Sequence, residues 1–124
     1  GLSDGRLAAA IRGIHARPAD DWTVARLARE AGMSRSSFHE RFQRAVGMTP
    51  IEYLTAWRLA LAKDFLRKGR MSVSEIARRV GYGSTSAFSV AFTRDVGISP
   101  IRYAREAVGI TPTTSAEQFE GAIA

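Results

Sequence analysis

The chain has 124 residues and a formal net charge of +6, and 45% of its residues are hydrophobic. This length fits one domain, or two half-size modules that share a connector, and the hydrophobic content excludes general disorder. The absence of cysteine excludes disulfides, thiolate metal sites and cysteine nucleophiles. Two histidines far apart in the sequence do not favour a metal site either, and we expect no cofactor.

The charge is unevenly distributed along the chain. All 18 basic residues precede residue 110, and the remaining tail adds only Glu117 and Glu120. A basic body with an acidic tail is typical of a protein that binds a polyanion. The alternative is a soluble protein whose charge only prevents self-association. No apolar run approaches the length of a membrane span, and no basic-then-apolar leader marks a secretory signal.

The spacing of apolar residues predicts an all-α fold of about seven helices. Apolar residues recur every three or four positions, and no alternating run indicates a strand. In chain order, the predicted helices cover about residues 3–16, 24–31, 35–46, 50–68, 73–80, 85–96 and 100–107.

Capping residues mark the boundaries of these helices. Thr23, Ser34 and Ser84 are predicted N-caps, and Thr49–Glu52 and Ser72–Glu75 have the spacing of capping boxes. The predicted helix ends carry glycines that can adopt a left-handed conformation: Gly32, Gly47, Gly69, Gly81 and Gly97.

The segment from Trp22 to Leu54 is repeated from Met71 to Ala104. The aromatic, glycine and proline positions recur 50 residues later: Phe38, Phe42, Gly47, Pro50, Ile51 and Tyr53 return as Phe88, Phe92, Gly97, Pro100, Ile101 and Tyr103. Each copy is a helix, a short glycine turn and a second helix, which is the helix-turn-helix pattern of DNA-binding proteins. The pattern alone also fits helical hairpins that bind nothing.

The helix over 35–46 presents two different sides. One is an apolar stripe with Phe38, Phe42, Ala45 and Val46. The other, which we name the first exposed face, consists of Arg35, Ser36, His39, Glu40 and Gln43. Arg35 and His39 can donate to guanine, and Glu40 can accept from cytosine. We predict base contacts for this face, with ordinary exposed residues as the alternative.

The same positions in the second copy form a smaller and almost uncharged surface. This second exposed face consists of Thr85, Ser86, Ser89, Val90 and Thr93, of which the first four are the predicted base-contacting residues. Thr85 and Val90 can pack against thymine methyl groups, so we predict base contacts here that depend more on shape than on hydrogen bonds.

Basic side chains and helix caps flank both exposed faces. The residues predicted to contact phosphate are Ser34, Arg41, Arg44, Arg58, Arg78, Arg79, Ser84 and Arg94. The competing interpretation is structural, because long basic side chains also cover apolar surface.

The helix over 50–68 is the predicted connector between the two copies. Its apolar stripe is expected to contain Leu54, Trp57, Leu61 and Phe65, with Arg58, Lys63, Arg67 and Lys68 in solvent. About 19 residues span roughly 28 Å, and successive major grooves on one side of B-DNA are about 34 Å apart. One chain can therefore hold two reading helices one turn apart.

These motifs resemble the signature of the AraC/XylS transcription regulators. The resemblance covers about residues 4–107 and includes the run Ser72–Tyr82, followed by Ser84, Phe88, Phe92, Gly97, Ser99, Pro100 and Tyr103. It implies two helix-turn-helix units joined by a long central helix, and sequence-specific binding of double-stranded promoter DNA, usually as an activator that contacts RNA polymerase. The family's base-reading positions fall on Ser36, His39, Glu40, Thr85, Ser86 and Val90.

Three positions depart from the family pattern. Val90 and Thr93 stand where many members carry Arg and Lys, and Ala104 follows Tyr103 where Arg is usual. Most members also have a separate N-terminal sensing and dimerising domain. Because this chain begins with Gly1, we expect such a domain in the natural protein. We expect the protein in the cytoplasm, associated with the nucleoid.

The expected organisation is a first module over 1–48, a linker helix over 49–69, a second module over 70–109 and a flexible tail over 110–124. An enzyme is the least favoured alternative, because there is no nucleophile elbow, phosphate loop or carboxylate pair. A helical adaptor that binds a protein through its basic surface stays open as the second interpretation.

Overall fold

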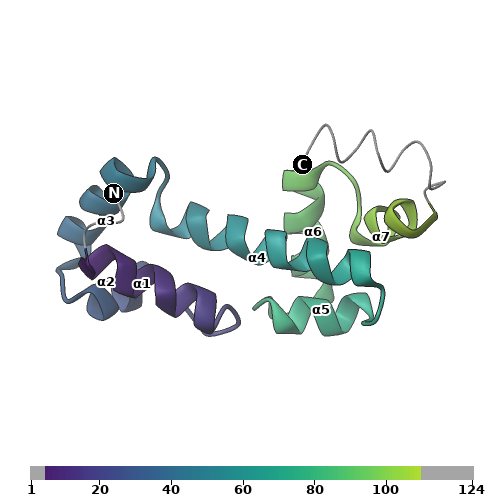
Figure 1. The fold of residues 1–124 in the computed structure, drawn as a ribbon, viewed down its shortest axis with the longest axis horizontal. Coiled ribbons are helices and arrows are strands. Elements are labelled where there is room, and N and C mark those ends of the chain that lie inside the picture. The colour runs from purple at the N-terminus through teal and green to yellow at the C-terminus, as the bar shows by residue number, and fades with distance from the viewer. Residues whose placement is uncertain (1–4, 110–124) are drawn as a thin grey trace. The chain divides into compact units, whose positions relative to one another are not determined.

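The computed structural model describes residues 5–109, and these form seven α-helices without a strand (Figure 1). The helices are α1 (Gly5–Ala16), α2 (Val24–Ala31), α3 (Arg35–Val46), α4 (Pro50–Lys68), α5 (Val73–Arg79), α6 (Thr85–Val96) and α7 (Pro100–Gly109). The all-α prediction with about seven helices is confirmed. The predicted start at Ser3 and the predicted tail over 110–124 lie outside the described residues. Within residues 5–109, no helix combines the length and apolarity needed to cross a membrane.

The predicted N-caps are formed as the sequence indicates. Thr23 Oγ1 accepts from the amide of Arg26 at 3.0 Å. At the start of α4 both halves of the capping box are present: Thr49 Oγ1 accepts from Glu52 N at 3.1 Å, and Glu52 Oε1 accepts from Thr49 N at 2.9 Å. These bonds satisfy amides that a helix start otherwise leaves without intrahelical partners.

The second predicted capping box differs from the first. Ser72 Oγ accepts from Glu75 N at 3.1 Å, but the Glu75 carboxylate accepts from Arg78 at 2.6 Å and Arg79 at 3.3 Å. Hydrogen bonding by Arg78 holds the pKa of Glu75 below its ordinary value. This carboxylate therefore pairs with the two arginines that follow it on α5 and offsets half of their charge.

The two copies turn between their helices in the same way. Gly32 N donates to Arg29 O and Met33 N to Ala28 O. In the second copy Gly81 N donates to Arg78 O and Tyr82 N to Ala77 O. Gly32 and Gly81 have φ of 69° and 103°, a left-handed conformation that favours glycine. Helix α5 ends at Arg79, one residue before the predicted end, because Val80 already caps it.

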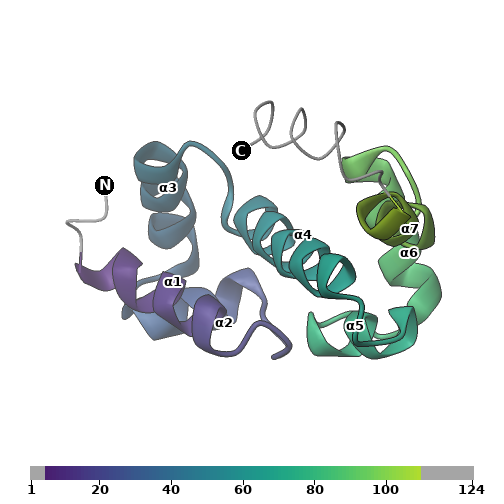
Figure 2. The same ribbon diagram turned by 45° about the vertical axis from the view of Figure 1, so that its right-hand side comes forward.

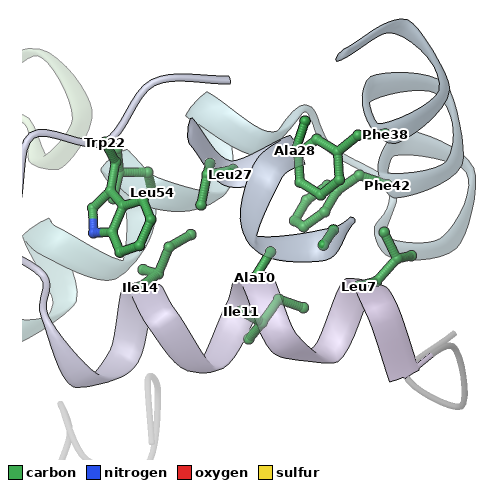
Figure 3. Packing of buried hydrophobic residues seen from close by; sticks show 11 residues of the cluster. Leu7, Ala10, Ile11, Ile14, Trp22, Leu27, Ala28, Phe38, Phe42 and Leu54 are labelled. Atoms are coloured by element: carbon green, nitrogen blue, oxygen red, sulfur yellow. The ribbon is translucent and has the colours of Figure 1, made fainter. Parts of the chain in front are cut away.

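The chain divides into two compact units, one up to Ala60 and one from Leu61. In the first unit, α1 packs on α2 and α2 packs on α3. Its core is built mainly from small and branched side chains of α1 and α2 against two phenylalanines of α3, and Figure 3 shows these side chains pointing toward one another: Leu7, Ala10, Ile11, Ile14, Trp22, Leu27, Ala28, Phe38, Phe42 and Leu54. In the second unit, α6 contacts α5 and α7, as can be followed in Figure 2.

Helix α4 contains the boundary between the units and has two buried faces. Leu54 belongs to the first core, but three of the four residues in the predicted stripe are only half-buried: Trp57, Leu61 and Phe65. The predicted stripe is therefore partly covered, with Leu54 in the first core and Trp57 packed against it, but it is not the most deeply buried side of α4. The buried residues further along α4 are Leu59, Ala62 and Leu66, about a third of a turn away around the helix.

A longer repeat explains this second face. The buried residues of α1 and of the second part of α4 recur in the same order 52 positions apart: Leu7, Ala10 and Ile14 against Leu59, Ala62 and Leu66. The start of α4 corresponds in turn to the start of α7, because Pro50 and Tyr53 recur as Pro100 and Tyr103. Helix α4 is thus the last helix of one copy continued into the first helix of the next.

Two aromatic rings of α4 pack against the end of α1. The His15 ring stacks on the Trp57 ring with centroids 4.0 Å apart, and His15 Nε2 lies 2.7 Å from the Tyr53 hydroxyl. Partial burial in this cluster lowers the pKa of His15 and raises the pKa of Tyr53. In the second copy, Arg67 of α4 donates to the hydroxyl of Tyr103 on α7 at 2.7 Å, so each copy anchors its tyrosine from its own first helix.

Replacing Gly13 by alanine tests the packing of the first core. A Cβ there would lie 3.0 Å from Trp22 Cη2, and the indole is held by a 2.8 Å hydrogen bond to Arg17 O. We expect Gly13→Ala to lower the free energy of unfolding by about 1–2 kcal/mol, because overpacking outweighs the better helix propensity of alanine. Both tryptophans belong to the first unit, so denaturant unfolding followed by fluorescence reports on it. The control is Gly5→Ala, where a Cβ meets nothing within 4 Å; an equal loss in both variants would contradict the account.

The His15 cluster predicts a pH-dependent stability of the first unit. The folded-state pKa of His15 lies below 6.5, so as the pH falls the unfolded chain takes up its proton first. The stability that neutral His15 contributes is present above about pH 6.5 and is lost as the pH falls toward the folded-state pKa. Fluorescence-detected unfolding should show this loss in the wild type and a smaller loss in His15→Gln. His39→Gln is the control and should keep the wild-type dependence; an unchanged dependence in His15→Gln would contradict the assignment.

Candidate nucleic-acid interface

The first exposed face lies on α3 opposite a fixed aromatic anchor. Phe38 and Phe42 are fully buried, their ring centroids are 5.6 Å apart, and Phe42 meets Tyr53 edge to face at 5.8 Å and 70°. Because side chains four residues apart share one side of a helix, this anchor fixes which side of α3 points outward. Of the other two residues in the predicted stripe, Val46 packs against the core and Ala45 is exposed.

The second unit repeats this anchor almost without change. Phe88 and Phe92 are fully buried with ring centroids 5.6 Å apart, and Phe92 meets Tyr103 edge to face at 5.6 Å and 73°. The rotation of α6 about its axis is therefore fixed in the same way as that of α3. Each helix turns the corresponding face away from its core.

The structure brings most of the first exposed face to one hollow. Arg35, Ser36 and Glu40 are exposed and His39 is half-buried. These four residues line a hollow of about 570 Å³ together with the first turn of α2. Gln43 is exposed one turn further along α3 and is not among the residues that line the hollow. The hollow is open, polar on the α3 side and bounded by a capped helix start.

The first turn of α2 is a part of this site that the sequence prediction omits. Thr23, Val24 and Ala25 form the opposite wall of the hollow. Thr23 is recognisable in the sequence as an N-cap, and helix starts present backbone amides that suit anions. The sequence does not show that Thr23 lies beside α3, because only the folded turn brings α2 and α3 together.

The second exposed face is less enclosed. Thr85 and Ser86 are exposed, Ser89 is half-buried and Val90 is 63% exposed. Of these residues, only Thr85 lines the hollow of about 170 Å³ beside α6. The exposed methyl groups of Val90 are available for contact with an apolar group.

Apart from Arg58, the residues predicted to contact phosphate fall into three groups. The helix caps Ser34 and Ser84 accept from Ser37 N at 3.3 Å and Ala87 N at 3.0 Å, and a hydroxyl that accepts in this way keeps its own proton for donation. Arg41 is exposed on α3. Four arginines form ion pairs on exposed surface: Arg44 with Glu40, Arg78 and Arg79 with Glu75, and Arg94 with Asp95. Exposed pairs of this kind are weak and can exchange partners.

Arg58 differs from the other arginines, and the expectation that it is solvated is wrong. Its guanidinium donates to Pro18 O at 2.9 Å and to Asp20 O at 2.8 Å, and the side chain is half-buried. These bonds fix the loop that precedes α2. The same loop carries Asp20, which accepts from Arg26 at 2.8 Å, and this hydrogen bond holds the pKa of Asp20 below its ordinary value.

Comparison with known proteins identifies the family. A helix-turn-helix domain model matches residues 27–106. A protein of Streptomyces lividans described as an AraC-like transcription regulator is 50% identical over 103 residues, which is 83% of this chain and 34% of that protein. The chain belongs to the AraC family. The helix-turn-helix-type transcriptional regulator AlkR of Acinetobacter baylyi is 43% identical over 100 residues, or 81% of this chain and 33% of its own length.

Solved structures support the same AraC-type fold. The DNA-binding domain of the global transcriptional factor AdpA, crystallised with a target DNA, has a TM-score of 0.82 and 30% identity over 88% of this chain and 98% of that one. An AraC-type protein from Chromobacterium violaceum, at 23% identity and a TM-score of 0.77, covers 89% of this chain and 96% of its own and shares the fold. The match spans about a third of the length of the two curated relatives from Streptomyces lividans and Acinetobacter baylyi.

A substitution at Arg58 tests whether this side chain is structural. Lysine keeps the charge but loses the planar fork that reaches two carbonyls, so we expect Arg58→Lys to lower the free energy of unfolding by about 1–3 kcal/mol. Tryptophan fluorescence during denaturant unfolding measures the change. Arg44→Lys is the matched control, because an exposed ion pair contributes less than about 1 kcal/mol. If Arg58→Lys unfolds like the wild type, the clamp on the loop is not important for stability.

Proposed function

We propose that this chain is the DNA-binding domain of a transcription regulator and binds double-stranded DNA sequence-specifically. In this proposal α3 and α6 enter successive major grooves, with the two exposed faces toward the bases. The observation that carries the proposal is the pair of matching aromatic anchors, which hold two helices with polar or methyl-bearing faces outward. Two recognition helices in one chain need a connector of suitable length, and a continuous α4 of 19 residues spans roughly 28 Å.

The chemistry of the faces supports unequal contributions from the two units. Arg35 and His39 are donors suited to guanine, and Glu40 is an acceptor suited to the amino group of cytosine. Thr85 and Val90 present methyl groups to thymine, with Ser86, Ser89 and Gln43 as further hydrogen-bonding groups. The first unit then supplies most of the hydrogen-bonded specificity, and the second adds apolar contact.

Charge supports the backbone contacts in this proposal. The proposed phosphate contacts are Ser34, Arg41, Arg44, Arg78, Arg79, Ser84 and Arg94. Phosphate neutralisation releases counterions, so the affinity should fall steeply with salt. We leave Arg58 out because its guanidinium already binds two backbone carbonyls.

The relatives support a wider setting for this domain. We propose modules over 1–48 and 70–109, a linker helix over 49–69 and a tail over 110–124. The natural protein is proposed to carry an N-terminal sensing and dimerising domain, to act in the cytoplasm at the nucleoid and to activate transcription through contact with RNA polymerase. The support is the named regulators, in which the segment that matches this chain makes up only about a third of the length.

The direct test is selection of bound sites from random duplex DNA. We expect one enriched sequence, with cytosine preferred at the position that Glu40 contacts. Glutamine donates as well as accepts and suits adenine, so Glu40→Gln should shift this position from cytosine toward adenine, a change in discrimination of about 1–3 kcal/mol. Affinity measured over a range of salt should decline linearly on a log–log scale.

A matched variant separates base contact from overall charge. Glu106→Gln changes the net charge equally, but Glu106 lies on α7, pairs with Arg102 at 2.9 Å and belongs to neither exposed face. It should leave the selected sequence unchanged. Selection of no sequence by the wild type, or salt-independent binding, would favour a protein-binding adaptor instead.

A further inference from the structure

The two recognition helices hold equivalent arginines in different ways. On α3, Arg44 Nη2 lies 3.1 Å from Glu40 Oε2. Glu40 belongs to the first exposed face and lines the hollow, whereas Arg44 does not line it. On α6 the equivalents of these residues are Val90 and Arg94, and Arg94 Nε pairs with Asp95 Oδ1 at 3.3 Å. Only the arginine on α3 is therefore bound to a residue of an exposed face.

Helix geometry makes the α3 pair directional. Side chains on a helix lean toward its N-terminus, so an arginine four residues after a glutamate reaches back over it. Glutamate before arginine at this spacing is the favourable order, and Arg44 stands in the last turn of α3, where the helix dipole favours a cation. Arg44 thus approaches Glu40 from the C-terminal side. The Glu40 carboxylate itself leans toward the N-terminus of α3.

A carboxylate that enters a DNA groove is repelled by the phosphates, and pairing with an arginine reduces this repulsion. The major groove is bounded by phosphates, and a bare Glu40 would be repelled by them as it approaches a base. Glu40 is also a flexible side chain at the surface, so its carboxylate must be ordered before it can accept from a cytosine amino group. A neighbouring cation that binds one carboxylate oxygen reduces both costs and leaves the other oxygen available.

We propose that Arg44 is a positioning residue for base recognition by Glu40. It orients the carboxylate and offsets its charge, so that the preference for cytosine belongs to the Glu40–Arg44 pair and not to Glu40 alone. The inference rests on the proposed function, because it requires that the first exposed face contacts bases. It departs from the simpler assignment of Arg44 to phosphate, in which this arginine adds affinity without affecting base choice.

The test compares base preference with overall affinity in the whole chain. Dissociation constants are measured for the selected duplex and for duplexes that differ only at the base contacted by Glu40. We expect Arg44→Ala to lower the preference for cytosine by about three- to tenfold, a fraction of what a good base contact supplies. Arg44→Lys should restore most of this preference, because a cation again lies beside the carboxylate. Arg94→Ala is the matched control and should weaken all duplexes alike.

A double variant distinguishes positioning from a phosphate contact. In the Glu40→Gln background the carboxylate is gone, so Arg44→Ala should no longer change the base preference, although it can still reduce overall affinity. If Arg44→Ala weakens all duplexes equally in the wild-type background, Arg44 contacts phosphate only and the inference is overturned. Tryptophan fluorescence of each variant confirms that the first unit is folded during the measurement.

The experiment also separates this inference from the proposed function. If wild-type protein prefers one base at this position and Glu40→Gln changes the preference, the proposed function stands and only the outcome for Arg44→Ala decides the inference. If the wild type binds every duplex equally, the proposed function fails and the inference fails with it.

Discussion

The aromatic anchor beneath each recognition helix is the constraint on which the other features depend. Two phenylalanines four residues apart are buried on one side of α3 and again of α6, and each pair ends against the edge of a tyrosine from the following helix. A helix held in this way cannot rotate about its axis without exposing two large rings, which would cost several kcal/mol. The outward face of each helix is therefore set by residues that have no part in binding.

Helix α4 joins the two copies of the module, because each copy uses one part of it. Its start corresponds to the start of α7, and its later part carries the buried pattern of α1. The loop before α2 is longer than its counterpart before α5. Residues of α1 recur 52 positions later in α4, but Trp22 recurs only 49 positions later as Met71. That longer loop is fixed by Arg58, by Arg26 and by the Trp22 indole. The first unit, with its larger hollow and more polar face, is thus also the unit with the additional clamp.

Periodicity, caps and glycines were sufficient to predict the helices, since these signals are local. Thr23, Thr49 and Gly32 act as expected because each depends only on residues a turn away. The second buried face of α4 was not predicted, because a helix that serves two cores has two buried faces and the spacing of Leu54, Leu61 and Phe65 reveals only one. Arg58 and the α2 wall of the hollow could not be predicted, because both depend on contacts between segments distant in sequence. The composition of the exposed faces followed directly from the anchor spacing.

The central claim is that one chain reads two neighbouring major grooves through faces of unequal chemistry. Hydroxyl-radical footprinting and base-methylation interference on the selected duplex, with the protein shown to bind as a single copy, test it most directly. The account predicts two protected segments one helical turn apart on the same side of the DNA, about 34 Å centre to centre, with stronger interference under the segment bound by α3. Protection confined to one groove by a single copy would contradict it.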